Sequence, residues 1–433
     1  MFSISVIFTF FLVLIFKNAI IRLGLGVRGI VSRVRYLKQI DRFYMQFIDL
    51  KAQQNQILPD GSTLIEDIEK NINDVIKHGK YILGPEVGKL ENKLANYVGT
   101  KHCIGLSSGT DALLAALMAL GINYKDEVIT TAFSFFATAE TIALVGAKPV
   151  FVDIDSSSYN IDYKKIEEAI SKRTKAIIAV SLYGQTADLR NINKIAEKYN
   201  IPVIEDGAQS FGGTHHNIKS GALSTIGTTS FFPSKPLGGY GDGGACFTDD
   251  DELASKIREI SLHGQTKRYT HDRIGINGRL DTIQAAILLS KIKIFDKEIK
   301  EREKIANRYI KEFNNYGFHE TPLIYPENKS VFAQFTIEVK GRDDVINFLS
   351  KKNIPTSIHY PSLLPNQKAL NQSLNKSNLL GKILKKNNYK SFNLNNALKA
   401  SKSVLSLPMH PLLKADDQDF IIKTLIESLE IAN

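Results

Sequence analysis

Residues Ser230–Gly244 read SFFPSKPLGGYGDGG, and this stretch decides how the rest of the chain is interpreted. A single lysine, Lys235, stands between two prolines and follows two phenylalanines. Five glycines lie between positions 238 and 244, which indicates a loop whose backbone comes close to another group. Most lysines are solvated surface residues. In an apolar setting, however, a lysine has a lowered pKa and attacks carbonyl carbons as a free amine, so this setting favours a Schiff-base lysine.

A carboxylate upstream of this stretch completes the pattern. Residues Ile201–Ser210 read IPVIEDGAQS, a short apolar run that ends in acidic residues. Such a run is typical of a strand buried in a parallel sheet, and Asp206 stands where that strand would end. A strand-end aspartate and a later lysine are what pyridoxal 5′-phosphate requires, because its pyridine nitrogen needs an acid partner and its aldehyde an amine. The sequence therefore predicts a pyridoxal phosphate site containing Asp206 and Lys235.

Helix and strand patterns alternate from about residue 86 to residue 250, which predicts an α/β fold with a mostly parallel sheet covered by helices on both faces. Ligands of such sheets bind beyond the carboxyl ends of the strands. We expect an N-terminal extension (1–44), a large cofactor-binding domain (45–295) and a smaller C-terminal α/β domain (296–433). The patterns predict helices at 86–98, 112–120, 138–145, 164–170 and 192–199, strands at 101–106, 128–131, 149–155, 176–182 and 201–206, and a long charged helix at about 283–315.

Charge and cysteine content exclude several classes of protein. The first 44 residues carry +6 of the net charge of +10, so the remainder is only mildly basic and a nucleic-acid-binding protein is disfavoured. The two cysteines, Cys103 and Cys246, lie far apart, and the sequence has no His/Cys spacing typical of a metal site. We therefore expect no metal, two small core thiols and a cytoplasmic protein.

The first 16 residues are almost wholly apolar, and Lys17 ends the run. The run is slightly shorter than the ~20 residues that a membrane-spanning helix needs. No positive charge precedes it, as a secretory signal would require. Three interpretations stay open: translation that starts at Met45, a membrane anchor, or a basic amphipathic segment at the membrane surface. Contact with the inner membrane is expected only if residues 1–44 are part of the protein.

Two further groups of residues are expected beyond the strand ends. Ser108, Gly109 and Thr110 stand where a strand passes into a helix, and free backbone N–H groups there bind anions. Next to Asp206 and Lys235, this position indicates a phosphate cradle to which Ser230 adds a hydroxyl, although Ser108 alone is typical of an ordinary helix cap. One of Phe133, Phe135 and Phe136 is placed to stack on a flat ring, and Gln209 to contact the ring hydroxyl.

Several longer motifs resemble one known family, the sugar-nucleotide aminotransferases of the DegT/StrS type, which are fold-type-I pyridoxal phosphate enzymes. The resemblance covers the chain from about Met45 to its end and leaves residues 1–44 outside. It rests on SSGTDAL (107–113), KDEVITTAFSFFATAET (125–141), GAKPVFVDID (146–155), EDGAQSFGG (205–213), SFFPSKPLGGYGDGGA (230–245) and GRLDTIQAA (278–286). Further motifs, YILGPEV (81–87), VSLYGQTADL (180–189), HYP (359–361) and LPMHP (407–411), are most similar to members that aminate a UDP-linked 3-oxo-hexuronate.

The resemblance implies a role for each candidate residue. Lys235 would form the Schiff base, Asp206 would pair with the pyridine nitrogen, and Gln209 would contact the ring hydroxyl. Gly109, Thr110 and Ser230 would hold the phosphate, with Phe135 stacked on the ring. From a second subunit, Asn277 would reach the phosphate and Arg279 a substrate carboxylate, while His359 and Tyr360 would line the sugar pocket. These shared residues imply a homodimer.

The implied reaction moves an amino group from L-glutamate, which leaves as 2-oxoglutarate, to the 3-keto group of a UDP-N-acetyl-3-oxo-hexuronate. The product would feed surface polysaccharide synthesis, such as that of O-antigen. Three alternatives stay open: the same chemistry on another keto sugar, such as a 4-keto deoxysugar; a non-catalytic regulator that binds the cofactor; and a membrane-docked scaffold that uses residues 1–44.

Overall fold

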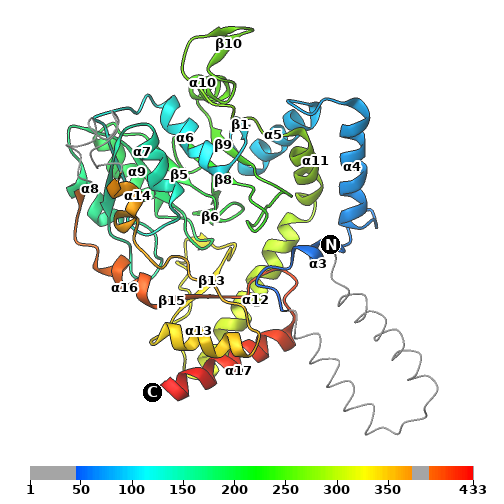
Figure 1. Cartoon of the computed structure of the whole chain (residues 1–433), viewed down its shortest axis with the longest axis vertical. Coiled ribbons are helices and arrows are strands. Elements are labelled where there is room, and N and C mark those ends of the chain that lie inside the picture. The colour runs from blue at the N-terminus through cyan, green and yellow to red at the C-terminus, as the bar shows by residue number, and fades with distance from the viewer. Residues whose placement is uncertain (1–44, 373–389, 433) are drawn as a thin grey trace. The chain divides into compact units, whose positions relative to one another are not determined.

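The computed structural model describes residues 45–372 and 390–432 (Figure 1). The strands of its main sheet are β1 (His102–Leu106), β2 (Glu127–Thr131), β3 (Lys148–Val152), β4 (Thr174–Val180), β5 (Val203–Asp206), β8 (Ile226–Ser230), β9 (Gly244–Thr248) and β14 (Lys390–Ser391). Within the described residues they form an eight-stranded sheet in the order β1-β9-β8-β5-β4-β2-β3-β14. Of these strands, only β9 runs in the direction opposite to the rest, so the predicted mostly parallel sheet is confirmed.

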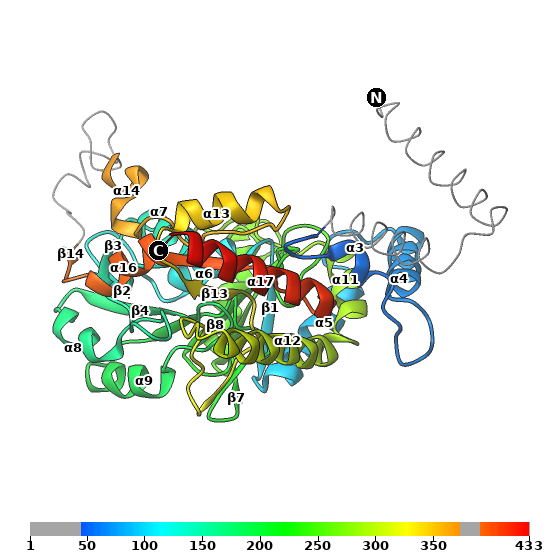
Figure 2. The ribbon, with the colours of Figure 1, turned by 90° about the horizontal axis from the view of Figure 1, so that it is seen from below.

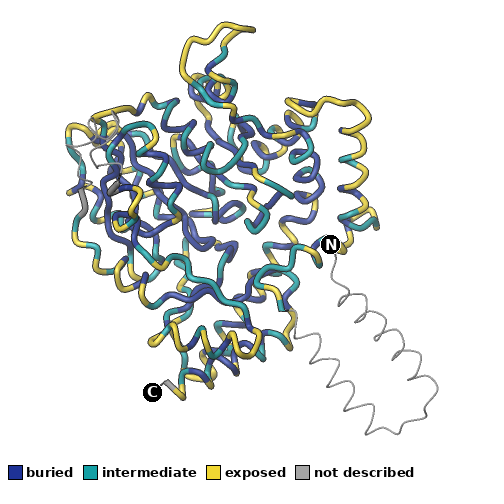
Figure 3. The backbone as a smooth tube through the Cα atoms, viewed as in Figure 1, coloured by how far each residue is buried: buried dark blue, intermediate teal, exposed yellow. Residues whose placement is uncertain are grey.

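Helices cover both faces of this sheet, because alternate side chains of each strand point to opposite sides. Ile104, Ile204 and Cys246 belong to one core cluster, and their strand neighbours Val203 and Phe247 belong to the clusters of the other face. Figure 3 shows that the buried backbone is concentrated in this layered part. The first face packs against α6 (Gly109–Ala119), α7 (Ala137–Leu144) and α10 (Asp251–Ser261), and the second against α5 (Pro85–Val98), α8 (Ile166–Ala169), α9 (Leu189–Lys198) and α11 (Thr282–Lys291).

The predicted long helix at about 283–315 is wrong, because the chain breaks into α11 and α12 (Phe295–Asn315). Ile292 and Phe295 pack in one apolar cluster while Ile294 packs in another. At the break, the N–H groups of Lys293, Ile294 and Phe295 donate to carbonyls three residues earlier rather than four, so the chain leaves the α-helical pattern between Lys291 and Phe295. The predicted helix 164–170 likewise divides into η2 (Tyr163–Lys165) and α8.

Several elements after α11 form a second, smaller unit, whereas β14 joins the main sheet and β12 (Asn328–Lys329) pairs with β6 (Thr214–His215). β13 (Phe335–Glu338) pairs antiparallel with β15 (Val404–Leu407). The C-terminal helix α17 (Ala415–Ala432) contacts both α12 and α13 (Arg342–Lys351), as Figure 2 shows from below. The α/β character predicted for this region is therefore present, and the boundary at 295/296, which coincides with the start of α12, stays a prediction.

The remaining elements are α3 (Leu50–Gln53), α4 (Leu64–His78), β7 (Ile218–Lys219), β10 (Gln265–Lys267), β11 (Thr270–His271), η3 (Leu364–Asn366), α14 (Lys368–Gln372) and α16 (Asn395–Ser403).

A buried polar contact fastens the segment that contains α3 to α12. The side chain of Glu298 is 3% exposed and lies within α12. Gln53 Nε2 donates to both of its carboxylate oxygens, at 2.8 and 2.9 Å, and Gln56 Nε2 donates to Glu298 Oε1 at 2.5 Å. A buried carboxylate is costly without such donors, so residues 53–56 are part of the folded unit.

Among residues 45–372 and 390–432, no helix combines the length and the apolar character needed to cross a membrane. The interpretations of residues 1–44, including the anchor, the amphipathic segment and the scaffold, fall outside the described residues.

Candidate active site

Three segments that are distant in sequence meet at the carboxyl edge of the main sheet. Strands β1, β5 and β8 end there at Leu106, Asp206 and Ser230. Gly109 opens α6 directly beside Ser230, since a Cβ added at Gly109 would lie 2.6 Å from Ser230 Cβ. Only glycine fits there, and the first N–H groups of a helix have no partner within it. The structure thus brings together Gly109, Thr110 and Ser230, the predicted phosphate cradle.

Asp206 is a buried carboxylate that can accept further hydrogen bonds. Its side chain is 6% exposed. Thr138 Oγ1 donates to Asp206 Oδ2 at 2.9 Å, and the Ala208 N–H donates to Oδ1 at 3.3 Å. Burial raises the pKa of Asp206, while these two bonds and the charge of Lys235 act against the rise. A carboxylate has about four acceptor positions, so Asp206 has room for a further donor.

Lys235 lies in the loop that follows β8, close enough to Asp206 for the charge of each group to affect the other's pKa. The loop is folded tightly, with Lys235 N–H donating to Phe232 O at 2.9 Å and Gly239 N–H to Phe231 O at 2.7 Å. Burial lowers the pKa of Lys235, and Asp206 opposes this shift. The amine is therefore biased toward its neutral, nucleophilic form.

Gln209 and Tyr360 form a polar contact beside these two groups. Gln209 Nε2 donates to Tyr360 Oη at 3.0 Å, and Gln209 Oε1 accepts from the Tyr183 N–H at 2.9 Å. The Tyr360 ring lies 6.2 Å from the ring of Phe135, whose side chain is 57% exposed. An exposed aromatic side chain beside Tyr360, which itself contacts Gln209, suits the predicted stacking of Phe135 on a flat ring.

His359 faces the same groups from the C-terminal part. Its Nδ1 lies 2.9 Å from Ser406 Oγ, and its backbone carbonyl accepts a hydrogen bond from Tyr183 Oη. Burial lowers the pKa of His359 to about 4, and the charge of Lys235 contributes to the shift. His359 is therefore a neutral imidazole at neutral pH, which suits contact with uncharged sugar hydroxyls.

Asn277 and Arg279 lie in the segment that runs beside the end of β1, next to the junction where Ser107 leads into the first turn of α6. Arg279 pairs with Leu106 at the end of β1 and Asn277 with Leu262, and the carbonyl of Gly278 accepts from Ser107 N–H at 2.9 Å. Asn277 is exposed. Their predicted roles in the site of a second subunit stay predictions.

These features fit pyridoxal phosphate. Asp206 has free acceptor capacity for a ring N–H, the amine of Lys235 lies near it, and the contact of Gly109 with Ser230 leaves no space for a side chain beside the first turn of α6. The aromatic face of Phe135 is exposed. Each residue type matches what one part of the cofactor needs.

Thr138, which donates directly to Asp206, was not among the site residues predicted from the sequence. This threonine lies inside a predicted helix, where buried polar residues give no pattern of their own. Ser134, which contacts Thr138, lies before the helix, so the periodicity of the helix gave no signal for this pair either.

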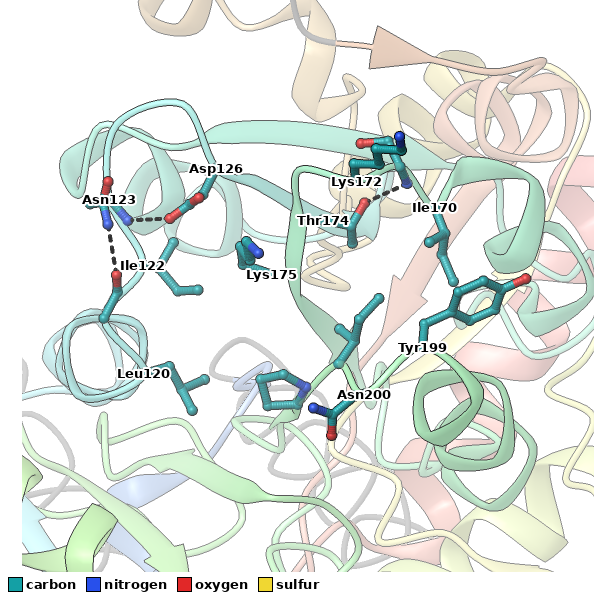
Figure 4. Close-up of a pocket in the computed structure, with 14 residues that line it drawn as sticks. Leu120, Ile122, Asn123, Asp126, Ile170, Lys172, Thr174, Lys175, Tyr199 and Asn200 are labelled. Atoms are coloured by element: carbon teal, nitrogen blue, oxygen red, sulfur yellow. Dashed lines mark hydrogen bonds between the residues drawn. The ribbon is translucent and has the colours of Figure 1, made fainter.

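A separate hollow of about 900 Å³ lies at the opposite edge of the sheet (Figure 4), around the amino ends of β2, β4 and β5. Its lining includes Asn123, Asp126, Lys175 and Tyr199. The N–H of Asn123 donates to Asp126 Oδ2 at 2.9 Å, so this carboxylate is engaged within the wall. None of the predicted site residues lines this hollow.

The buried histidine His410 predicts how the free energy of unfolding depends on pH. Burial lowers the pKa of His410 to about 4, with Arg302 adding to the shift. Because an unfolded histidine titrates near 6.5, protons bind the unfolded chain preferentially as the pH falls from about 6.5 to 4, and the free energy of unfolding drops. We expect the His410→Gln variant to lose about 2 kcal/mol less between about pH 7 and pH 5 than the wild type. Urea unfolding of the cofactor-free proteins at both pH values measures this, and equal losses would contradict the burial of a neutral His410.

Comparison with known proteins places the chain among its relatives. A sequence model of the DegT/DnrJ/EryC1/StrS aminotransferase family matches residues 62–426. The UDP-2-acetamido-2-deoxy-3-oxo-D-glucuronate aminotransferase of Pseudomonas aeruginosa is 51% identical over 369 residues, which is 85% of this chain and 96% of that protein.

Solved structures agree with this match. A DegT/DnrJ/EryC1/StrS aminotransferase from Brucella abortus superimposes with a TM-score of 0.81 at 40% identity, covering 89% of this chain and 100% of that one. NtdA from Bacillus subtilis, solved with bound cofactor PMP, superimposes with a TM-score of 0.78 at 33% identity, covering 89% and 85%. The chain therefore belongs to the DegT/DnrJ/EryC1/StrS aminotransferase family.

Proposed function

We propose that this chain is a pyridoxal phosphate-dependent aminotransferase that moves an amino group from L-glutamate to the 3-keto group of a UDP-linked N-acetyl-3-oxo-hexuronate. The observation that carries the proposal is a buried strand-end carboxylate, Asp206, near enough to the amine of Lys235 for each charge to shift the other group's pKa. The relative from Pseudomonas aeruginosa, whose name states this sugar class, supports the choice of acceptor.

Each residue has one task in the proposal. When bound, pyridoxal phosphate supplies an aldehyde that receives the amino group and a ring that withdraws electrons from the donor's Cα. Asp206 holds a proton on the ring nitrogen, and Gly109, Thr110 and Ser230 bind the phosphate. Lys235 Nζ takes the Cα proton of the donor and later returns a proton to the carbon that becomes aminated. Its lowered pKa leaves the amine free to act as a base.

Arg279 is the residue proposed to bind the carboxylate of the acceptor sugar. A guanidinium matches a carboxylate with two parallel hydrogen bonds, which suits a uronate rather than a neutral sugar. The exposed position of Asn277 in the same loop is compatible with both side chains entering the site of a second copy. The proposal therefore includes a homodimer with shared sites.

The direct test incubates the purified protein with pyridoxal phosphate, L-glutamate and a set of UDP-linked keto sugars, followed by mass spectrometry. The set contains the 3-oxo-hexuronate, its neutral 3-oxo-hexose counterpart and a 4-keto deoxysugar. Amination of the 3-oxo-hexuronate with equal release of 2-oxoglutarate is the expected result. Turnover of the 4-keto sugar alone would replace the proposed acceptor, and binding of the cofactor without any turnover would favour the non-catalytic regulator.

Replacing Arg279 with alanine separates the two sugar classes. We expect kcat/KM for the 3-oxo-hexuronate to fall about 10- to 100-fold, since a charge-assisted pair is lost. The neutral 3-oxo-hexose should change much less. Because Arg279 is also a candidate ligand for the donor's carboxylate, release of 2-oxoglutarate from L-glutamate alone is measured separately. Arg190→Ala, an exposed arginine on α9, is the control. Equal losses for both sugars would show that Arg279 does not read the uronate.

A further inference from the structure

A short chain of hydroxyl groups stands behind Asp206. Thr138 Oγ1 donates to Asp206 Oδ2 at 2.9 Å, and Ser134 Oγ lies 3.1 Å from Thr138 Oγ1. Ser134 lies just before α7, and Thr138 is the second residue of that helix. Thr138 is 0% exposed and Ser134 is 4% exposed, so water does not compete for these bonds.

The direction of this chain follows from the charge of Asp206. An ionised carboxylate only accepts hydrogen bonds, so the single hydroxyl proton of Thr138 is committed to it. Thr138 Oγ1 can then act only as an acceptor toward Ser134, which becomes the donor of that pair. Donors arranged in sequence polarise one another, so the bond that reaches Asp206 is strengthened.

The neighbouring carboxylate, Glu205, is held by more donors than Asp206. Glu205 is 0% exposed and accepts from Ser220 Oγ at 2.7 Å, Ser181 Oγ at 2.9 Å and Gly221 N–H at 2.7 Å. Asp206 accepts from two donors in the described part of the chain, Thr138 and Ala208, and the contact with Ala208 is long at 3.3 Å. Thr138 is therefore the principal fixed donor that favours the charged form of Asp206.

We propose that Thr138, supported by Ser134, is a positioning residue that holds the Asp206 side chain in place as an anion and so keeps a proton on the cofactor's ring nitrogen. This inference rests on the proposed function, because it assigns Asp206 to that nitrogen. If the hydroxyl is lost, the proton shared by the carboxyl and the ring moves toward Asp206, and the ring withdraws electrons less strongly. The other charged or titratable groups that affect Asp206, which are Lys235, Glu205 and Tyr360, are the same in every variant below.

The test is Thr138→Val, which keeps the shape of the side chain and removes only the hydroxyl. We expect the dissociation constant of pyridoxal phosphate to rise about 10- to 100-fold. We also expect ¹⁵N NMR of ring-labelled cofactor to show reduced protonation of the ring nitrogen, and kcat to fall while KM for L-glutamate stays near the wild-type value. Thr138→Ser should restore all three properties. Thr141→Val is the matched control, because Thr141 is equally buried in α7 but its hydroxyl donates only to backbone carbonyls, those of Ala137 at 2.9 Å and Thr138 at 3.4 Å, and not to Asp206.

The outcomes separate this inference from the proposed function. If the wild-type protein binds no pyridoxal phosphate, the proposed function fails first. If it binds the cofactor and Thr138→Val leaves the ring-nitrogen signal unchanged, the inference is overturned. In an Asp206→Asn background the Thr138→Val change should have little further effect on cofactor affinity, whereas a full additional loss would mean that Thr138 acts elsewhere. Should the valine variant not fold, Ser134→Ala tests the same chain, with a smaller rise in dissociation constant expected and an unchanged ring-nitrogen signal counting against it.

Discussion

The Lys235→Ala protein is expected to transfer amino groups at least about 10³-fold more slowly than the wild type, because it lacks both the amine that bonds to the cofactor and the base that moves the Cα proton. Release of 2-oxoglutarate from L-glutamate in a single turnover measures the loss without needing the sugar. Affinity for pyridoxal phosphate should weaken in parallel, and the visible absorbance of the bound cofactor should change.

Lys219 provides the matched control for this experiment. Burial lowers its pKa as well, and its ammonium lies 3.9 Å from the centroid of the Tyr97 ring, among residues distinct from the predicted site. Lys219→Ala should therefore change stability more than catalysis. If Lys235→Ala turned over glutamate and keto sugar at the parent rate, the assignment of the whole site would be wrong.

Asp206→Asn is expected to lower kcat about 10²- to 10³-fold, because an amide cannot balance a positive charge on the ring nitrogen. The loss should appear in the glutamate half-reaction and in the sugar half-reaction alike, since both need the same electron withdrawal. The folded protein should survive the change, because burial opposes the charged form of Asp206 and the amide removes that charge. Stopped-flow kinetics of each half-reaction, together with thermal unfolding of the cofactor-free protein, measure these effects.

Asp249 is the control for that variant, since it also follows a strand, but at the other edge of the sheet after β9, where it accepts from Lys101 N–H at 2.7 Å. Asp249→Asn should leave kcat near the wild-type value. An Asp206→Asn enzyme with wild-type kcat in both half-reactions would remove the carboxylate from the mechanism.

The sequence predicted the parts of the fold that follow from local pattern. The apolar run before Asp206 is strand β5, and the helix expected at 86–98 is α5, which begins one residue earlier at Pro85. Both rest on periodicity over many residues, a signal that neighbours in space rarely override. The sequence also placed Asp206 and residues 107–110 just after strand ends, and parallel strands bring such ends to one edge of a sheet.

What escaped prediction depends on contacts between distant residues. The antiparallel insertion of β9 between β1 and β8 is set by the glycine-rich loop, which returns the chain along the sheet. The break between Lys291 and Phe295 is a local switch to i→i−3 hydrogen bonds, which the continuous helical pattern of the sequence does not show. Thr138 meets Asp206 from 68 positions away, and a threonine inside a helix looks the same whether or not it has such a partner.

The hydrogen bonds from Gln53 and Gln56 to Glu298 limit how far the protein can be shortened from its amino-terminal side. The part that matches the family model begins at residue 62, beyond both glutamines. A protein trimmed to that point would lose both amide donors to the buried Glu298 carboxylate, which would keep the nearby charges of Lys291 and Arg302. A buried group left without such hydrogen bonds typically costs about 1–3 kcal/mol. Studies of a minimal enzyme should therefore keep residues 45–61, even though those residues contribute no side chain to the predicted chemistry.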